Sequence, residues 1–304
     1  MTATDLTAAA KPGTTFHKTS LRRRLTNDIA AVGFGLCFLL AIAPLVSLLY
    51  MVVSKGIRAI IKPEWWTNSM YRVAPSSYDG GVYHAIFGSL AQALIAAIIS
   101  VPIGILVGIY LVEYGQGGAL GRVTTFMVDV LAGIPSIVAT LFIYGVWITT
   151  LGLPQSAFAV SLALILLMVP VVVRSTEEML KLVPHDLREA SFALGVPKWK
   201  TILRIVIPTA ASGMVSGVFL AIARVVGETA PVLLLVGVSD KINQNIFDGN
   251  MSSLPLFIYQ QFSSNPGEVG QYRVWGAALT LVILVAIASA LAALVSKLLA
   301  PKTK

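Results

Sequence analysis

Cysteine and charged residues are both scarce in this sequence. The only cysteine among the 304 residues, Cys37, lies in an apolar stretch. One thiol cannot form a disulfide within the chain or build a metal site from several cysteines. Charged residues make up 12% of the chain, whereas soluble domains carry about 25%. With so few charges the chain cannot cover a large solvated surface, and an ordinary soluble domain is excluded.

The sequence also lacks the patterns of the main enzyme classes that work in or on membranes. It has no phosphate-binding loop of the form G-x-x-x-x-G-K-[ST], which cradles ATP in many ATPases. Its one deep ionisable pair, Arg224 and Glu228, matches neither the paired aspartates nor the metal or Ser-His arrangements of intramembrane proteases. We therefore expect no enzyme activity, and no cofactor or metal ion held by this chain.

Apolar residues dominate what is present, at 56% of the chain. A hydrocarbon core about 30 Å thick needs about 20 apolar residues in a helix. Five uncharged runs reach that length, and the third is long enough for two spans. They predict an all-α membrane protein with six transmembrane helices. The runs are residues 29–54, 84–112, 130–174, 205–223 and 274–296.

The net charge of +8 is best explained by membrane topology. In a soluble chain it would suggest nucleic acid as a partner, but membrane proteins concentrate Lys and Arg in their cytoplasmic loops. Placing both termini inside puts most of the 22 basic residues in the cytoplasm. We therefore predict both termini inside and no nucleic-acid partner. The basic residues left outside are Lys55, Arg58, Lys62, Arg72, Lys241 and Arg273.

The ends and the external loops have the composition of unfolded connections. Residues 1–28 are predicted to be a flexible basic cytoplasmic tail, either throughout or with a short amphipathic helix at its end. Residues 29–298 are predicted to be the transmembrane domain and residues 299–304 a second cytoplasmic tail. The last external loop, residues 239–272, has the Asn, Gly and Pro of an irregular connection. Trp65 and Trp66, in the first external loop, are predicted to anchor the chain at the membrane interface.

A polar segment, "HDLREASFALGV", interrupts the apolar pattern and carries the signals of a short helix. Asp186 can cap the free N–H groups at its start, with Glu189 three residues later as in a capping box. Gly195 can take the left-handed conformation that ends a helix, and Pro197 prevents continuation. We therefore predict a separate helix at about residues 186–197.

The small side chains of this segment leave room for a partner. Ala190, Ser191 and Ala193 would let another protein surface approach the helix closely. The same composition also fits an amphipathic helix that lies at the membrane interface. Both interpretations are open from the residues alone.

The spacing of the segment resembles a known motif. Written as E-A-small-x-x-x-G, then nine residues, then I-x-I-P, it is similar to the EAA motif of ABC-importer permeases. Ser191 and Ile207 replace the Ala and Leu that the family prefers, which are mild departures. The motif residues are Glu189, Ala190, Ser191, Gly195, Ile205, Ile207 and Pro208. The resemblance implies a coupling helix that docks on a cytoplasmic ATPase through Asp186, Glu189, Ala190, Ser191, Leu194 and Gly195.

Two charges lie within the apolar segment "AIARVVGETAPVLLLVGV". A charged side chain at a helix centre costs roughly 2.5 to 3.5 kcal/mol, so such groups normally face a bundle interior or a water-filled path. Four residues apart, Arg224 and Glu228 are predicted to share one helix face and to pair. In one interpretation this pair only fixes helix packing.

In the other interpretation, Arg224 binds an oxyanion that crosses the bundle, because a guanidinium matches phosphate geometry. Glu228 would restrain Arg224 in the empty path and accept the proton that hydrogen phosphate carries and sulfate lacks. Ser136, after Pro135 in the middle of the third span, either lines the same path or marks a kink.

A longer resemblance covers residues 29–298. The EAA segment, together with "LAGIPSIVATLF" and "ARVVGETAPVLL", is similar to permeases of phosphate ABC importers. The R-x-x-G-E-T-A-P pattern discriminates best, because the EAA motif alone fits permeases for many solutes. The resemblance implies a type I importer permease fold in the bacterial cytoplasmic (inner) membrane. It also implies a phosphate path with Arg224, Glu228 and Ser136.

Several partners follow from the same resemblance. They are a homologous second permease, an ATPase dimer that binds ATP and Mg, an extracytoplasmic phosphate-binding protein, phosphate itself, and membrane lipid. Two alternatives stay open from the residues: a permease for another oxyanion such as sulfate or molybdate, and a membrane signalling subunit that transports nothing.

Overall fold

The computed structural model describes residues 20–265 and 267–299, and every regular element in these ranges is helical. The chain divides after Met51 into two units. The first, described from residue 20, consists of α1 (Leu21–Ile60) as far as Met51. The second unit holds the last turns of α1 and all the other helices.

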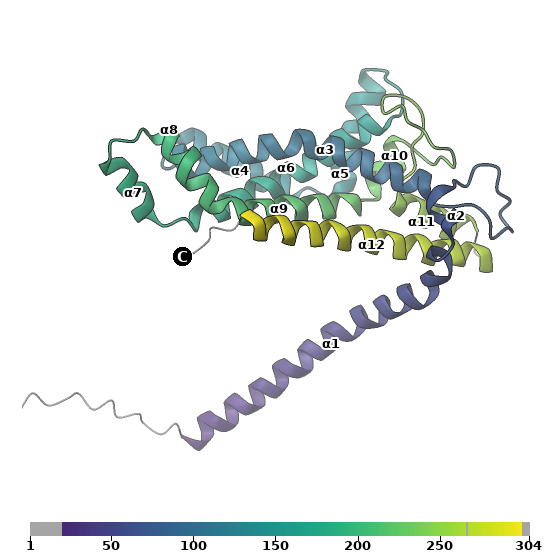
Figure 1. The fold of residues 1–304 in the computed structure, drawn as a ribbon, viewed down its shortest axis with the longest axis horizontal. Coiled ribbons are helices and arrows are strands. Elements are labelled where there is room, and N and C mark those ends of the chain that lie inside the picture. Colours follow the sequence, from purple (N-terminus) through teal and green to yellow (C-terminus); the bar gives the residue numbers. More distant parts are fainter. Residues whose placement is uncertain (1–19, 266, 300–304) are drawn as a thin grey trace, which may run out of the picture. The chain divides into compact units, whose positions relative to one another are not determined.

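The elements of the second unit follow one another with short connections (Figure 1). After α1 come α2 (Pro63–Thr67), α3 (Tyr83–Ile109), the π-helical turn η1 (Tyr110–Tyr114), α4 (Ala119–Gly133), α5 (Ser136–Ile143), η2 (Tyr144–Thr150) and α6 (Ala157–Lys181). They are followed by α7 (His185–Ala193), α8 (Lys198–Thr201), η3 (Ile202–Val206), α9 (Ile207–Val226), α10 (Ala230–Leu235), α11 (Leu254–Ser264) and α12 (Glu268–Leu299).

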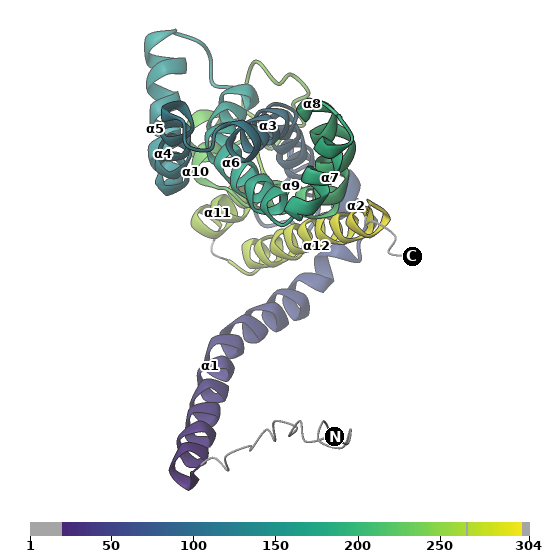
Figure 2. The same ribbon diagram turned by 90° about the vertical axis from the view of Figure 1, so that its left-hand side faces the viewer.

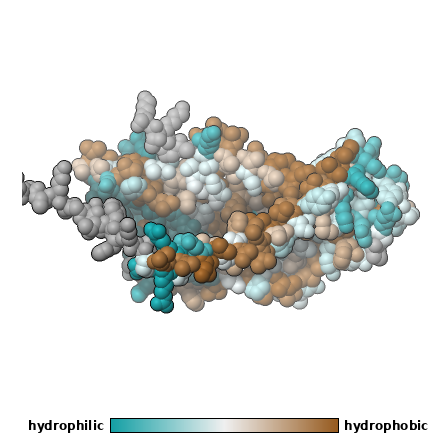
Figure 3. All heavy atoms as spheres, turned by 90° about the horizontal axis from the view of Figure 1, so that it is seen from below, coloured by the Kyte–Doolittle hydropathy of each residue, from teal (hydrophilic) through white to brown (hydrophobic). Residues whose placement is uncertain are grey.

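Five stretches of helix are long and apolar enough to cross a membrane: α1, α3 with η1, α6, α8 to α9, and α12. A sixth span is reached when α4 and the continuous helix of α5 and η2, bent by 102° at a short break, are counted as one. The predicted all-helical membrane fold is therefore confirmed, with five spans and a sixth if the bent pair is one span. Figure 3 shows apolar side chains over much of the surface, with hydrophilic ones gathered toward both ends of the view.

The predicted boundaries of the tails need correction. Helix α1 begins at Leu21, so residues 21–28 are helical and do not belong to a flexible tail. These residues contain no Pro or Gly, and their arginines and leucines are good helix formers. Residues 1–19 and 300–304, which make up the rest of the two predicted tails, lie outside the described residues.

The third span also begins earlier than predicted, at Ala119 and not at Val130. Its first half, α4, carries Arg122 and Asp129, so counting only uncharged residues shortened it. The helix then breaks at Pro135, whose missing N–H cannot continue the helical hydrogen bonds.

Two predictions for the external loops are wrong. The last loop contains a helix, α11, whose residues Leu254, Leu256 and Phe257 are fully buried. Trp65 is also buried, and its Nε1–H donates to Thr280 Oγ1 at 2.9 Å, so it is a packing residue and not an interfacial anchor. Trp65 and the buried residues of α11 therefore belong to the hydrophobic core of the second unit.

The centre of the second unit is α6, which packs between α3 and α9 (Figures 1 and 2). Glycines permit this close approach. An added Cβ at Gly104 of α3 would lie 2.6 Å from Val172 Cγ1 of α6. An added Cβ at Gly217 of α9 would overlap the side-chain oxygen of Ser175, which lies one turn further along α6. Any larger residue at these positions must push the helices apart.

Candidate functional site

Helix α7 stands apart at one end of the helices, near α8 (Figures 1 and 2). It begins at His185, one residue before the predicted cap, with Pro184 in extended conformation ahead of it. No side chain caps its first turn. The predicted capping role of Asp186, and the capping box with Glu189, are therefore wrong. Asp186 lies instead within the first turn, where its charge favours the positive end of the helix dipole.

The end of α7 matches the prediction. Gly195 has a φ of 73°, in the left-handed region. Its N–H donates to Phe192 O at 2.9 Å, and the N–H of Val196 donates to Ser191 O at 3.2 Å. This is the double hydrogen-bond pattern of a Schellman cap, which satisfies the last carbonyls of a helix. Pro197 then precedes α8.

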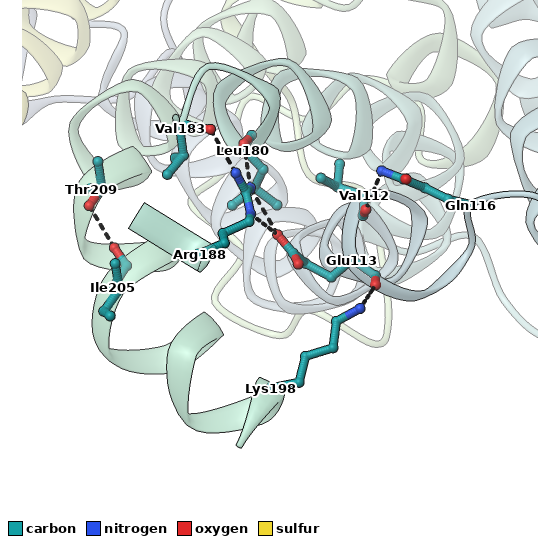
Figure 4. Close-up of polar contacts among 9 residues, drawn as sticks. All are labelled: Val112, Glu113, Gln116, Leu180, Val183, Arg188, Lys198, Ile205 and Thr209. Carbon is teal, nitrogen blue, oxygen red and sulfur yellow. Dashed lines mark hydrogen bonds and ion pairs between the residues drawn. The ribbon is translucent and has the colours of Figure 1, made fainter. Parts of the chain in front are cut away.

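A buried arginine fixes the inner face of α7 (Figure 4). The side chain of Arg188 is 10% exposed and that of Glu113 in η1 is 6% exposed. Arg188 Nη2 lies 2.9 Å from Glu113 Oε1 and also donates to Leu180 O at 3.0 Å. Its Nη1 donates to Val183 O at 2.6 Å. We call Arg188, Glu113 and the carbonyls of Leu180 and Val183 the clamp.

The clamp joins α7 to the end of the second span, which is distant in the sequence, and to the end of α6, which directly precedes α7. The carbonyl of Leu180 lies in the last turn of α6, where it also accepts the N–H of Val183 at 3.3 Å, and the carbonyl of Val183 follows the helix end. We therefore expect a movement of α7 to carry the ends of α3 and α6 with it. Glu113 was not identified from the sequence, where it is only an acidic residue at the end of an apolar run.

Further contacts hold α7 against α8 and η1. Ser191 Oγ lies 2.8 Å from Thr201 Oγ1, and both side chains are buried. Lys198 donates from Nζ to the carbonyl of Glu113 and lies over the Tyr114 ring. Ser191 therefore faces inward, and the predicted opening for a partner at this residue is corrected to an internal contact.

The other face of α7 is free of these contacts. Glu189, Ala190 and Ala193 are exposed, as is Leu194, whose exposed fraction of 84% is high for an apolar residue. Phe192 and Trp199 add exposed aromatic surface nearby. Large exposed apolar groups next to small residues are typical of a surface that another protein covers.

A second candidate region lies between α4, α6 and α9, where a cavity of about 360 Å³ is found. Arg224 of α9 lines it, and among the described residues it forms no ion pair. The residues that bound the polar part of this cavity are Arg174, Ser175, Glu178 and Arg224. Leu131, Ile134 and Gly217 supply apolar walls.

The predicted pairing of Arg224 with Glu228 is wrong. Helix α9 ends at Val226, and Gly227 follows as its cap. Glu228 therefore lies beyond the helix and does not share a helical face with Arg224. It is partly buried and does not line the cavity. Ser136 is the first residue of α5, directly after the bend, and does not line the cavity either, although its neighbour Ile134 does.

A network of charges that the sequence did not reveal lies beside this cavity. Arg174 forms ion pairs with Asp129 of α4 and, at 2.6 Å, with Glu177. Lys181 pairs with Glu177 at 2.7 Å. Arg174 therefore links α4 to α6 through ion pairs that neutralise its charge. Arg224 has no such partner among the described residues. Among the described residues there is no group of His, Cys, Asp and Glu that would hold a metal ion.

The model of one protein family matches residues 100–304, two thirds of the chain. This family is described as the inner membrane component of binding-protein-dependent transport systems. The chain belongs to this family. It is thus a multi-pass subunit of the inner membrane that works in transport, in a system with a binding protein.

Individual relatives agree with this membership. A protein of Mycobacterium leprae (strain TN), named phosphate transport system permease protein PstA, is 63% identical over 267 residues, 88% of this chain and 87% of the relative. PstA 1 of Mycobacterium tuberculosis (strain CDC 1551 / Oshkosh) is 58% identical over 280 residues, 92% of this chain and 91% of the relative. A PstA of Xylella fastidiosa (strain 9a5c) is 37% identical over 269 residues, 88% and 91% of the two chains.

Solved structures support the fold of the permease. A chain of the inward-facing MetNI methionine ABC transporter is similar with a TM-score of 0.56 and 20% identity, covering 73% of this chain and 95% of that one. A chain of a bacterial ABC transporter that imports the acidic polysaccharide alginate has a TM-score of 0.58 and 11% identity, covering 89% and 96%. At these identities the likeness concerns the fold alone.

Proposed function

We propose that this chain is a permease subunit of an ATP-driven importer of inorganic phosphate. The observation that carries the proposal is the 63% identity to a protein named as a phosphate transport system permease, over 88% of this chain. The cavity with Arg224 supports it, because an unpaired guanidinium can offer two parallel N–H donors to a phosphate oxygen pair.

In this proposal phosphate passes along the cavity between α4, α6 and α9. Arg224 binds the ion briefly, and the neutralised Arg174 shapes the wall without competing for it. Glu228, just beyond the end of α9, is our candidate to accept a hydrogen bond from the proton of hydrogen phosphate, and Ser136 remains a candidate on the path beside the bend. A homologous second permease would close the path on its open side.

Energy enters at α7 in this proposal. The exposed face with Glu189, Ala190 and Leu194 docks on an ATPase dimer in the cytoplasm, with Asp186 at the start of the helix and Gly195 at its end. The clamp passes the movement to α3 and α6. ATP and Mg²⁺ bind to that partner and not to this chain. Both termini then lie inside, and an extracytoplasmic binding protein delivers phosphate at the opposite end.

The test is ATP-dependent uptake of labelled phosphate by the complete complex in proteoliposomes, with sulfate as competitor. For Arg224→Gln we expect uptake to fall by at least about tenfold, because one charged hydrogen-bond donor to an ion contributes roughly 1.5 to 3 kcal/mol. Excess sulfate should not reduce uptake by the parent.

Arg122→Gln is the matched control, since Arg122 is exposed at the start of α4 and does not line this cavity. It should transport at the parental rate. Full uptake by Arg224→Gln would remove the proposed ion contact, and strong inhibition by sulfate would favour a general oxyanion permease.

A further inference from the structure

A cluster of basic side chains lies at the end of the helices opposite α7, where α1 ends and α12 begins (Figure 1). Lys55, Arg58 and Lys62 line one cavity of about 530 Å³ there. Among the described residues none of the three has a carboxylate partner within ion-pair distance, and Glu268 is the one acid in the lining. The cavity thus carries an excess of positive charge.

The position of this cluster is unusual for a membrane protein. Its three cations are half of the six basic residues that the sequence places outside, where membrane proteins have few. Lys55 and Arg58 are three residues apart on one face of α1, and Lys62 follows just after the helix ends. Neither the ion path nor α7 involves them.

A second cavity, of about 500 Å³, adjoins the basic one. The two share Lys55, Gln271 and Trp275. The second cavity continues past Val274 and Phe262, so most of its new lining is apolar. A ligand that fills both must carry an anionic group at one end and an apolar chain at the other.

The aromatic residues around the cluster place it at the level of lipid headgroups. Lys55 Nζ lies 4.9 Å from the centre of the Trp275 ring, and Lys62 Nζ lies 5.5 Å from that of Tyr272. Trp and Tyr gather at membrane–water interfaces, and long basic side chains reach from the apolar region to that level.

We propose that this pair of cavities binds one anionic phospholipid. Lys55, Arg58 and Lys62 would hold its phosphodiester and headgroup, and the groove of Val274, Trp275 and Phe262 would hold the first part of an acyl chain. A zwitterionic lipid binds less well, because its ammonium group meets the same three cations. Free phosphate has the anionic chemistry but leaves the apolar groove empty.

The test uses the purified full-length chain in detergent, titrated with phosphatidylglycerol and followed by native mass spectrometry. Phosphatidylcholine with the same acyl chains and inorganic phosphate are the comparison ligands. We expect phosphatidylglycerol to bind at least tenfold more tightly than phosphatidylcholine, and inorganic phosphate not to displace it. For K55Q/R58Q we expect roughly thirtyfold weaker binding of phosphatidylglycerol, since each basic residue near an anionic surface contributes about fivefold.

R72Q/K241Q is the matched control, because it removes two positive charges that lie outside both cavities and contact the ring of Tyr71. It should bind phosphatidylglycerol as the parent does. If K55Q/R58Q does not fold, K62Q alone tests the same contact with an expected fivefold loss.

Three outcomes would overturn the proposal. Equal binding of the two lipids would mean that the groove recognises acyl chains alone. Displacement by inorganic phosphate would identify a site for the free ion. If K55Q/R58Q keeps full lipid binding but loses binding of the extracytoplasmic binding protein, the cluster is a surface for that protein.

Discussion

The contacts of Arg188 depend on its burial, which the sequence did not indicate. On the sequence it stands in a polar, helical segment and resembles any solvated arginine. In the structure it lies among the ends of three elements and makes hydrogen bonds to one carboxylate and two carbonyls. A charge buried in this way is stable only with its partner, because an unpaired charge in the interior loses its hydration without compensation.

Replacing Arg188 by Met should therefore destabilise the chain by about 3 to 5 kcal/mol, since Glu113 stays buried and loses its partner. The double variant R188M/E113L, which removes both charges, should recover most of that stability. Thermal unfolding of the purified full-length chain in detergent measures both. The double variant should still fail to couple ATP hydrolysis to transport, because the bonds to the end of α6 are gone.

The control is Arg204→Met, because Arg204 is an exposed arginine in η3 with no ion pair among the described residues. It should change stability by less than about 0.5 kcal/mol. If R188M proves as stable as the control, the buried pair is not important for folding. If the double variant transports normally, the clamp does not transmit movement.

At the scale of the elements, local signals predicted the end of α7 better than its beginning. Gly195 is the one residue of its segment that takes a positive φ without strain, so the stop was readable. The predicted start was one residue too late. The backbone of Pro184 is extended, and the helix begins directly after it, at His185. Helix α11 was missed since its short apolar run lies between Asn- and Gly-rich stretches.

The cap at Gly195 leads to a prediction for α7. An added Cβ there would meet no atom within 4 Å, so a substitution acts through the backbone and not through a clash. Gly195→Val should cost roughly 1 to 2 kcal/mol, because a branched residue disfavours the left-handed region, and should disturb the exposed face of α7.

The ratio of phosphate transported to ATP hydrolysed in the reconstituted complex measures the effect, and Gly195→Val should lower it. Gly195→Asn is the comparison, because asparagine tolerates a positive φ and should keep most of the coupling. An equal loss in both variants would show that the partner needs the small size of glycine and not its conformation.

At the scale of the whole molecule, the membrane spans could be predicted from the sequence, because a helix that crosses a hydrocarbon layer needs only sufficient length and apolarity. The arrangement of the helices did not follow, because in a membrane all faces of a helix are apolar and periodicity carries little information about neighbours. The sequence therefore predicted only part of the cavity around Arg224. The arginine was identified, whereas its separation from Glu228 by the helix end at Gly227, and the neighbouring network of Arg174, required the structure.

Global stability should also depend on one acid of the external loops. Burial raises the pKa of Asp240 above its usual value, and the nearby Arg273 opposes this only in part. The folded chain therefore binds this proton more tightly than the unfolded chain, so the free energy of unfolding falls as the pH rises from 3.8 through the raised pKa. Above that pKa the charged, buried carboxylate remains a constant destabilisation.

Asp240→Asn should consequently be more stable than the parent at pH 7, and the difference should vanish at a pH below the usual aspartate value. Thermal unfolding in detergent at a series of pH values measures this. Asp248→Asn, at an exposed position of the same loop, should show no such difference. A parent that exceeds Asp240→Asn in stability at pH 7 would mean that the attraction to Arg273 outweighs burial.

The glycine contacts along α6 have a mechanical meaning. Because Val172 is in close contact with Gly104 and Ser175 with Gly217, we expect helices α3, α6 and α9 to move together and not to slide past one another. In the proposed transport cycle the width between α6 and α9 would then stay constant. The segment of α4 and α5, whose helix is already interrupted at Pro135, is the part of the cavity wall that we expect to move.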